Sequence, residues 1–190
     1  MRSCYFARYH FALYFAFLDP NNRSFMIDAT SRVYSLLLIV LTAAILLASF
    51  YFEFVLGLNP CPLCLMQRFC VILMLPCTMI SYYCKQEHFL RWALRIQLVV
   101  AGAGVFFAGR QVWLQLLPME QVPVCLPGLK MMMHYLPWHE VVRTLFLGAG
   151  DCAETPWKWL GLSMPAWALL YFLGMFIATS VISHRQGRVI

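Results

Sequence analysis

Two cysteines at the start of an apolar segment carry the strongest chemical signal in the chain. Cys61 and Cys64 are separated by Pro62 and Leu63, and Arg68 follows four residues after Cys64. Two thiols at this spacing can close a disulfide, and Pro62 restricts the backbone between them. The pair is therefore either a redox switch or half of a metal site.

Arg68 favours the redox interpretation. Residues i and i+4 share a helix face, so the guanidinium of Arg68 is expected near the sulfur of Cys64. That charge and the positive potential at a helix N-terminus favour the thiolate, which is the nucleophile. Beside lipid, the same charge would attract an electron-rich acceptor such as a quinone carbonyl. The alternative is that Arg68 only anchors the helix at the membrane interface.

Two further cysteines, Cys125 and Cys152, are expected on the same side of a membrane as this pair. Four cysteines in two loops suggest the disulfides Cys61–Cys64 and Cys125–Cys152. The second would close a loop of about 27 residues, and a cross-link of that length stabilises by about 3 kcal/mol, so it could be a structural staple. Two disulfides at one surface can also exchange, and a pair beside lipid can pass electrons to a quinone.

The other four cysteines are expected outside these two loops. Cys70 and Cys77 fall inside an apolar segment, where a cysteine usually packs as a small hydrophobe. Cys4 and Cys84 are expected near the cytoplasmic face, where thiols stay reduced.

The composition indicates that the bilayer surrounds most of the chain. Of its 190 residues 62% are hydrophobic and only 12% are charged, with a mean hydropathy of +0.72. The net charge of +6 comes from scattered basic residues, so no nucleic-acid partner is expected.

The apolar pattern predicts an all-α integral membrane protein built as a four-transmembrane-helix bundle. Since about 20 apolar residues cross the hydrocarbon core, the helices are expected at about 33–53, 65–83, 93–115 and 165–182. These helices define a membrane domain over 32–183, with loops at about 54–64 and 116–164. The second loop is expected to carry a short interfacial helix over Trp138–Leu147. Residues 1–31 are expected to be a cytoplasmic or mis-started extension, with Met26 as the alternative start, and 184–190 a cytoplasmic tail.

Basic residues predict the orientation. Lys and Arg are more numerous on the side that holds both termini: Arg2, Arg8, Arg23, Arg32, Lys85, Arg91, Arg95, Arg185 and Arg188. By the positive-inside rule, both termini are cytoplasmic and both cysteine loops are periplasmic in a bacterial inner membrane. Arg110 lies toward the periplasmic end of the third helix, where it either reaches the headgroups or serves the site.

Three segments carry a family resemblance: NPCPLCLMQR at 59–68, GDCAE at 150–154 and WLGLSMPAW at 159–167. On these motifs the chain, over about 31–183, is identified as a member of the disulfide bond formation protein B (DsbB) family. Proteins of this family are known to keep the bacterial periplasm oxidising, together with DsbA and quinone.

The resemblance implies a quinone-reducing protein-disulfide oxidoreductase. It implies that a reduced DsbA-like periplasmic protein of thioredoxin fold attacks the Cys125–Cys152 disulfide and is captured by Cys125. The Cys61–Cys64 pair then reoxidises the loop pair. Cys64 with Arg68 engages a bound ubiquinone or menaquinone from the membrane quinone pool, and no metal is involved.

Two alternatives stay open. The chain could be a dedicated DsbB paralogue that serves a single partner. It could also be a membrane protein in which four thiolates hold zinc or copper(I). Against the metal site, Cys125 and Cys152 are not a close-spaced pair, and an oxidising compartment competes for the thiols.

Overall fold

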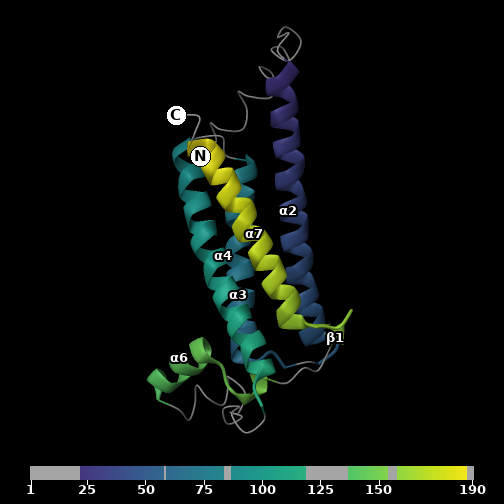
Figure 1. Cartoon of the computed structure of the whole chain (residues 1–190), viewed down its shortest axis with the longest axis vertical. Helices are drawn as coiled ribbons and strands as arrows, with labels where there is room; N and C mark the ends of the chain where they lie inside the picture. Colours follow the sequence, from purple (N-terminus) through teal and green to yellow (C-terminus); the bar gives the residue numbers. More distant parts are fainter. Residues whose placement is uncertain (1–21, 58, 84–86, 119–136, 154–157, 188–190) are drawn as a thin grey trace. The chain divides into compact units, whose positions relative to one another are not determined.

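The computed structural model describes residues 22–57, 59–83, 87–118, 137–153 and 158–187 (Figure 1). They belong to two compact parts, residues 1–37 and residues 38–190. Helix α2 (Asn22–Phe54) begins in the first part and continues into the second. The second part contains every site residue treated below, and the packing described here is that part's own.

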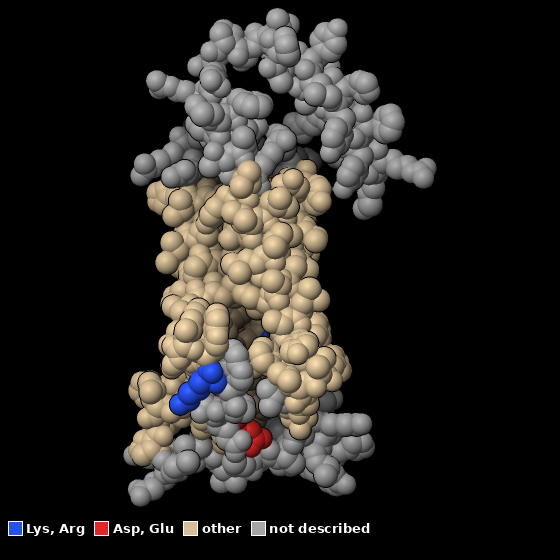
Figure 2. Space-filling view, turned by 90° about the vertical axis from the view of Figure 1, so that its right-hand side faces the viewer, with Lys and Arg blue, Asp and Glu red and all other residues tan. Residues whose placement is uncertain are grey.

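Long apolar segments form the helices of the described chain. Four of its helices are long and apolar enough to cross a membrane: Val33–Phe54 within α2, α3 (Pro62–Tyr83), His88–Leu116 within α4 (Glu87–Leu116), and Met164–His184 within α7 (Met164–Gly187). A helix satisfies its own backbone hydrogen bonds, which lipid cannot do. On the face drawn in Figure 2, the described residues form a broad uncharged band, and the described charged side chains lie toward one end of it. The predicted fold class, an all-α membrane protein with four spanning helices, is confirmed.

Helix α3 begins at Pro62, three residues before the start expected from the apolar pattern. Proline suits the first helical position because its missing N–H has no partner there in any helix. Cys61 caps the helix, since its carbonyl accepts the N–H of Leu65 (3.1 Å) and its sulfur accepts the N–H of Cys64 (3.4 Å). Both cysteines therefore belong to the first turn of α3.

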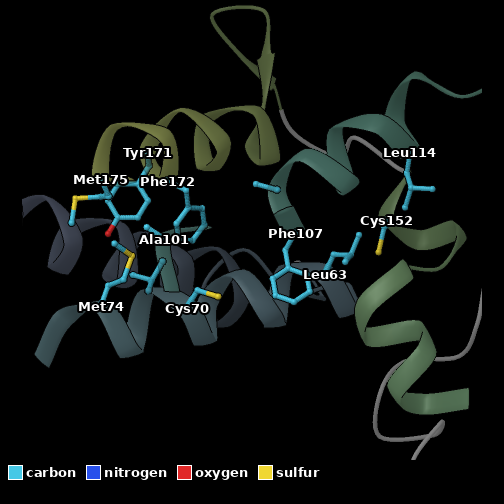
Figure 3. Close-up of a cluster of buried hydrophobic side chains, with 12 residues drawn as sticks. Leu63, Cys70, Met74, Ala101, Phe107, Leu114, Cys152, Tyr171, Phe172 and Met175 are labelled. Atoms are coloured by element: carbon cyan, nitrogen blue, oxygen red, sulfur yellow. The ribbon is translucent and has the colours of Figure 1, made fainter. Parts of the chain in front are cut away.

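Helices α3, α4 and α7 lie side by side in the second part (Figure 1). Their contacts form one buried cluster: Leu63, Cys70, Val71, Met74, Ala101, Phe107, Ala108, Leu114, Cys152, Tyr171, Phe172 and Met175. Figure 3 shows Met74, Tyr171 and Met175 at one end of the cluster, and Leu63, Leu114 and Cys152 at the other. The loop cysteine Cys152 is thus part of the same core as the spanning helices.

A glycine brings α4 and α7 into close contact. A Cβ atom on Gly104 would overlap the ring of Phe172, which is itself fully buried. Small residues allow such contacts between membrane helices, where van der Waals packing replaces the hydrophobic driving force. Gly104 therefore sets the distance between these two helices.

The loop after α4 is built against the ends of α3 and α4. Helix α6 (Trp138–Leu147) covers the segment predicted to form the interfacial helix. It ends at Gly148, whose φ of 81° is costly for any residue with a Cβ. A Cβ at Gly148 would also lie 2.8 Å from side-chain atoms of both Leu63 and Leu114. The 3₁₀ helix η2 (Gly150–Cys152) begins two residues after Gly148 and places Cys152 in the core.

A short hairpin precedes α7 in a region that the sequence predicted only as loop. Strands β1 (Lys158–Trp159) and β2 (Leu162–Ser163) pair antiparallel across Leu160 and Gly161, which both have positive φ, as in a type I′ turn. The hydroxyl of Ser163 donates to Oε1 of Gln115 on α4 at 2.7 Å. The hairpin is thereby attached to the helix bundle.

Candidate thiol redox site

The sulfurs of Cys61 and Cys64 lie 2.9 Å apart at the start of α3, where the thiol of Cys61 donates to Cys64. Both are free thiols in this structure, and a disulfide would bring the sulfurs to about 2.05 Å. Only a small movement within one helical turn is needed to close the bond. The Cys61–Cys64 disulfide stays a prediction, and this geometry suits it.

Cys152 joins this pair from the loop. Its side chain is 0% exposed, and Figure 3 places its sulfur beside Leu63 and Leu114. The Cys152 thiol is hydrogen-bonded with the Cys61 thiol and with the backbone of Leu63. Three sulfurs therefore follow one another in the order Cys152, Cys61, Cys64. Cys125 lies outside the described residues, so its pairing with Cys152 stays a prediction.

The hydrogen bond between Cys61 and Cys152 shifts the pKa values of the two thiols in opposite directions. Hydrogen bonds with Cys152 and then Cys64, together with burial, raise the pKa of the Cys61 thiol. The hydrogen bond with Cys61 lowers the pKa of the Cys152 thiol, even though burial opposes the shift. A thiolate is the nucleophile in thiol–disulfide exchange. In the reduced protein Cys152 is thus the activated neighbour of Cys61.

Gln111 contacts the cysteine pair and Gln67 contacts Gln111, and the sequence analysis missed both glutamines. Nε2 of Gln111, on α4, donates to the sulfur of Cys61 (3.3 Å) and to that of Cys64 (3.2 Å). Nε2 of Gln67, on α3, donates to Oε1 of Gln111 at 2.7 Å. An amide inside an apolar segment is costly unless it is hydrogen-bonded. The polar residues within two apolar spanning segments were the available signal, and Gln67 and Gln111 are two of several.

Arg68 forms its hydrogen bonds with α2, and its charge also acts on the Cys64 sulfur, as the i, i+4 spacing led us to expect. Nε donates to the hydroxyl of Ser49 (2.9 Å), a terminal nitrogen donates to the Ser49 carbonyl (3.1 Å), and the other terminal nitrogen pairs with Glu53. The guanidinium carbon also lies 4.8 Å from the centre of the Phe50 ring. The side chain is only 12% exposed, so it is not a solvated interface anchor.

A cavity of about 700 Å³ joins these groups. Its walls come from α2, α3, α4, α7 and the hairpin. Most of the lining residues are apolar, among them Leu41, Ile45, Phe52, Val71, Trp159, Met164, Trp167, Leu170 and Phe172. Cys64, Gln67, Arg68 and Gln111 line the same space. An apolar cavity with a few converging polar groups is the usual form of a small-molecule site.

Comparison with known proteins decides the family. The family model described as disulfide bond formation protein DsbB matches residues 31–182. The chain belongs to the DsbB family. The match agrees with the limits expected from the motifs, and it places the cysteine row and the cavity inside the family domain.

Relatives of the DsbB family extend over most of the chain. A disulfide bond formation protein B from Marinobacter nauticus is 42% identical over 163 residues, which is 83% of this chain and 97% of that protein. One from Stutzerimonas stutzeri is 43% identical and covers 72% of this chain and 85% of its own length. Disulfide bond formation protein B 1 of Pseudomonas aeruginosa is 39% identical over 76% of this chain and 90% of its own length. This DsbB-family chain is a bacterial membrane oxidoreductase of disulfide bond formation.

Other residues singled out in this DsbB-family chain lie apart from the row. Nε of Arg110 donates to the carbonyl of Leu147 at 3.2 Å, so it holds the end of α6 instead of entering the cavity. Cys70 and Cys77 are buried in α3, and Cys70 packs in the core cluster. Cys4 and Cys84 lie outside the described residues. Within the described ranges, no group of three or more His, Cys, Asp or Glu side chains is arranged to hold a metal ion.

Proposed function

We propose that this protein reoxidises a DsbA-like periplasmic protein of thioredoxin fold and passes the electrons to a membrane quinone. One observation carries the proposal: the sulfurs of Cys152, Cys61 and Cys64 follow one another from the loop to the wall of the cavity. Such a row lets each exchange step occur between neighbouring sulfurs. The partner and the quinone are therefore proposed to meet opposite ends of one path.

The first exchange involves the loop pair. The partner's dithiol attacks the proposed Cys125–Cys152 disulfide, with Cys125 forming the mixed disulfide; the partner leaves oxidised and both loop cysteines become thiols. The Cys152 thiolate then attacks the Cys61 sulfur of the Cys61–Cys64 disulfide. A Cys152–Cys61 bond forms, the Cys61–Cys64 bond breaks, and the electron pair goes to Cys64.

The second exchange resets the loop. Cys125 attacks Cys152 of the Cys152–Cys61 disulfide, which restores the loop disulfide and releases Cys61. The two electrons of the partner now reside on Cys61 and Cys64. Cys64 faces the cavity while Cys61 keeps its contact with Cys152. The pair is thereby held between the loop and the electron acceptor.

The cavity fits ubiquinone or menaquinone. Its volume of about 700 Å³ lies in the range of about 300–1,000 Å³ that is typical of small-molecule sites. The apolar walls suit a flat ring with an isoprenoid tail, and Arg68 can donate to a carbonyl oxygen while Cys64 lies in the same wall. When bound, a quinone accepts two electrons and two protons. Arg68, Cys64 and the aromatic wall would hold it, and Glu53 fixes Arg68 by their ion pair.

The orientation follows from the same proposal. The partner is periplasmic, so both cysteine loops are proposed to face the periplasm and both termini the cytoplasm of an inner membrane. The proposed domain limits are 32–183 for the membrane domain, with 1–31 as an extension and 184–190 as a tail. A panel of partner proteins in the assay below separates a general oxidase from one dedicated to a single partner.

A thiol-trapping experiment tests the proposal. The purified full chain is alkylated before and after a reduced thioredoxin-like partner is added, with and without a soluble quinone. We expect two disulfides at rest, their loss with the partner alone and their return with quinone. Four free thiols that ignore quinone would contradict the proposal. Cys64→Ser should stop the cycle, whereas Cys70→Ser, which changes a packed cysteine of the same helix, should not.

A further inference from the structure

We propose that Gln111 is a catalytic residue that tunes the reduction potential of the Cys61–Cys64 pair through hydrogen bonds to both sulfurs. The inference rests on the proposed redox role of this pair. Nε2 of Gln111 lies 3.3 Å from the sulfur of Cys61 and 3.2 Å from that of Cys64. A single amide group thus spans the two atoms between which the disulfide forms and breaks.

Gln67 fixes which end of the Gln111 amide faces the sulfurs. Its Nε2 donates to Oε1 of Gln111 at 2.7 Å, so that oxygen is the acceptor and the NH₂ group points to the cysteines. The reversed amide would set two NH₂ groups against each other. Gln67 does not bond to the sulfurs itself, and we assign it as a positioning residue that acts through Gln111.

Burial strengthens the hydrogen bonds of these two glutamines. Gln111 is 3% exposed and Gln67 is 8% exposed, both inside apolar spanning segments. A hydrogen bond in such surroundings is stronger than in water because no solvent competes for the partners. The thiol of Cys64 also lies 3.6 Å from Oε1 of Gln111, so the amide offers a donor to a thiolate and an acceptor to a thiol. Gln111 therefore serves this sulfur in either protonation state.

The sign of the effect follows from the charge on sulfur. Reduction of the Cys61–Cys64 disulfide adds two electrons and two protons, or one proton where one sulfur remains a thiolate. Donor groups stabilise an electron-rich reduced sulfur more than a disulfide sulfur, which is a weak acceptor. Gln111 should therefore make the pair easier to reduce. That favours electron transfer from the loop cysteines into the pair.

A redox titration tests this assignment. The full chain in detergent, without quinone, is equilibrated at a series of ratios of reduced to oxidised glutathione, where each disulfide is reduced by two glutathione thiols. Alkylation and mass spectrometry of the peptide holding Cys61 and Cys64 give the reduced fraction. We expect Gln111→Met to lower the equilibrium constant for reduction about tenfold, which is a potential lower by about 30 mV. Gln111→Asn keeps the amide but is one methylene shorter, so it should shift the constant in the same direction.

Matched variants separate this role from a structural one. Gln115→Met removes a glutamine from the same helix, one turn further on, where the side chain bonds to Ser163. It should leave the equilibrium constant within about twofold of the native value, and an equal shift in this control would overturn the proposal. Changes below twofold in both Gln111 variants would also overturn it. Helical content and melting temperature, measured on each variant, show that the fold is kept.

The glutamine pair itself gives a second check. If Gln67 acts through Gln111, Gln67→Met should lower the equilibrium constant in the native chain and have no effect in the Gln111→Met background. An equal effect in both backgrounds would refute that assignment. Failure of the proposed function would give a different result from failure of the Gln111 assignment. Cys61 and Cys64 of the native chain would then form no disulfide at any glutathione ratio.

Discussion

Replacement of Arg68 by methionine should weaken quinone use by about 10- to 100-fold and leave exchange with the partner intact. A guanidinium carries five N–H groups. Three of those on Arg68 bond to Ser49 and Glu53 within the described residues, and the other two are available to a ligand in the cavity. A hydrogen bond from a charged group contributes about 1.5–3 kcal/mol. With 1.4 kcal/mol per factor of ten, its loss gives the stated range, and at 12% exposure little is lost to solvent screening.

The assay separates the two halves of the reaction. Steady-state quinone reduction by the purified chain, driven by the reduced partner, gives KM for quinone, and a single turnover without quinone gives the rate of thiol exchange. Only KM should change in Arg68→Met. The matched variant Glu53→Gln keeps the cation and its bonds to Ser49, so KM should change by less than about fivefold, as expected for a partly exposed ion pair (Glu53 is 27% exposed). An unchanged KM in Arg68→Met would refute the role assigned to Arg68.

Three further predictions concern the loop and the bundle. Gly104→Ala should destabilise the protein by about 1–3 kcal/mol, because the new Cβ would overlap Phe172. Thermal unfolding in detergent measures this loss. The control Gly102→Ala, whose new Cβ would lie 3.7 Å from Phe176, should change the stability little. Arg110→Met removes an exposed hydrogen bond to the end of α6, a loss of about 0.5–1.5 kcal/mol, and should speed alkylation of reduced Cys152 by about two- to tenfold; an unchanged rate would contradict the tether. In the reduced protein the pH midpoint for alkylation of Cys152 should lie below the ordinary cysteine value. Cys61→Ala should raise this midpoint, since the hydrogen bond that lowers the pKa of Cys152 most is then lost; Cys77→Ala is the control.

The sequence could predict what depends on composition and local spacing. Long apolar runs require spanning helices, and the amphipathic pattern of Trp138–Leu147 was enough to locate α6. The start of α3 was placed too late because the apolar count ignored Pro62 and the capping sulfur of Cys61. Helix α4 begins at Glu87, before the expected residue 93, because a helix can continue into charged residues beyond the apolar run.

The contacts of the site depend on the tertiary fold and could not be predicted from spacing. Cys152 meets Cys61 although 91 residues separate them, because Gly148 lets the chain turn against Leu63 and Leu114. The i, i+4 rule placed Arg68 on the face of Cys64, but Ser49 and Glu53 on another helix decide where its guanidinium lies. Gln67 and Gln111 are visible as polar residues in apolar segments, yet nothing local indicates that they bond to each other and to sulfur.

The central claim is that electrons pass from a periplasmic dithiol through Cys152, Cys61 and Cys64 to quinone. Its most direct test measures, in one sample, the loss of quinone absorbance and the disulfide gained by the partner, for the native chain and for Cys152→Ser. The account predicts one quinone reduced for each partner disulfide formed by the native chain, and neither product with Cys152→Ser. Quinone reduction that persists in Cys152→Ser, or partner oxidation by the native chain without a matching loss of quinone, would contradict it.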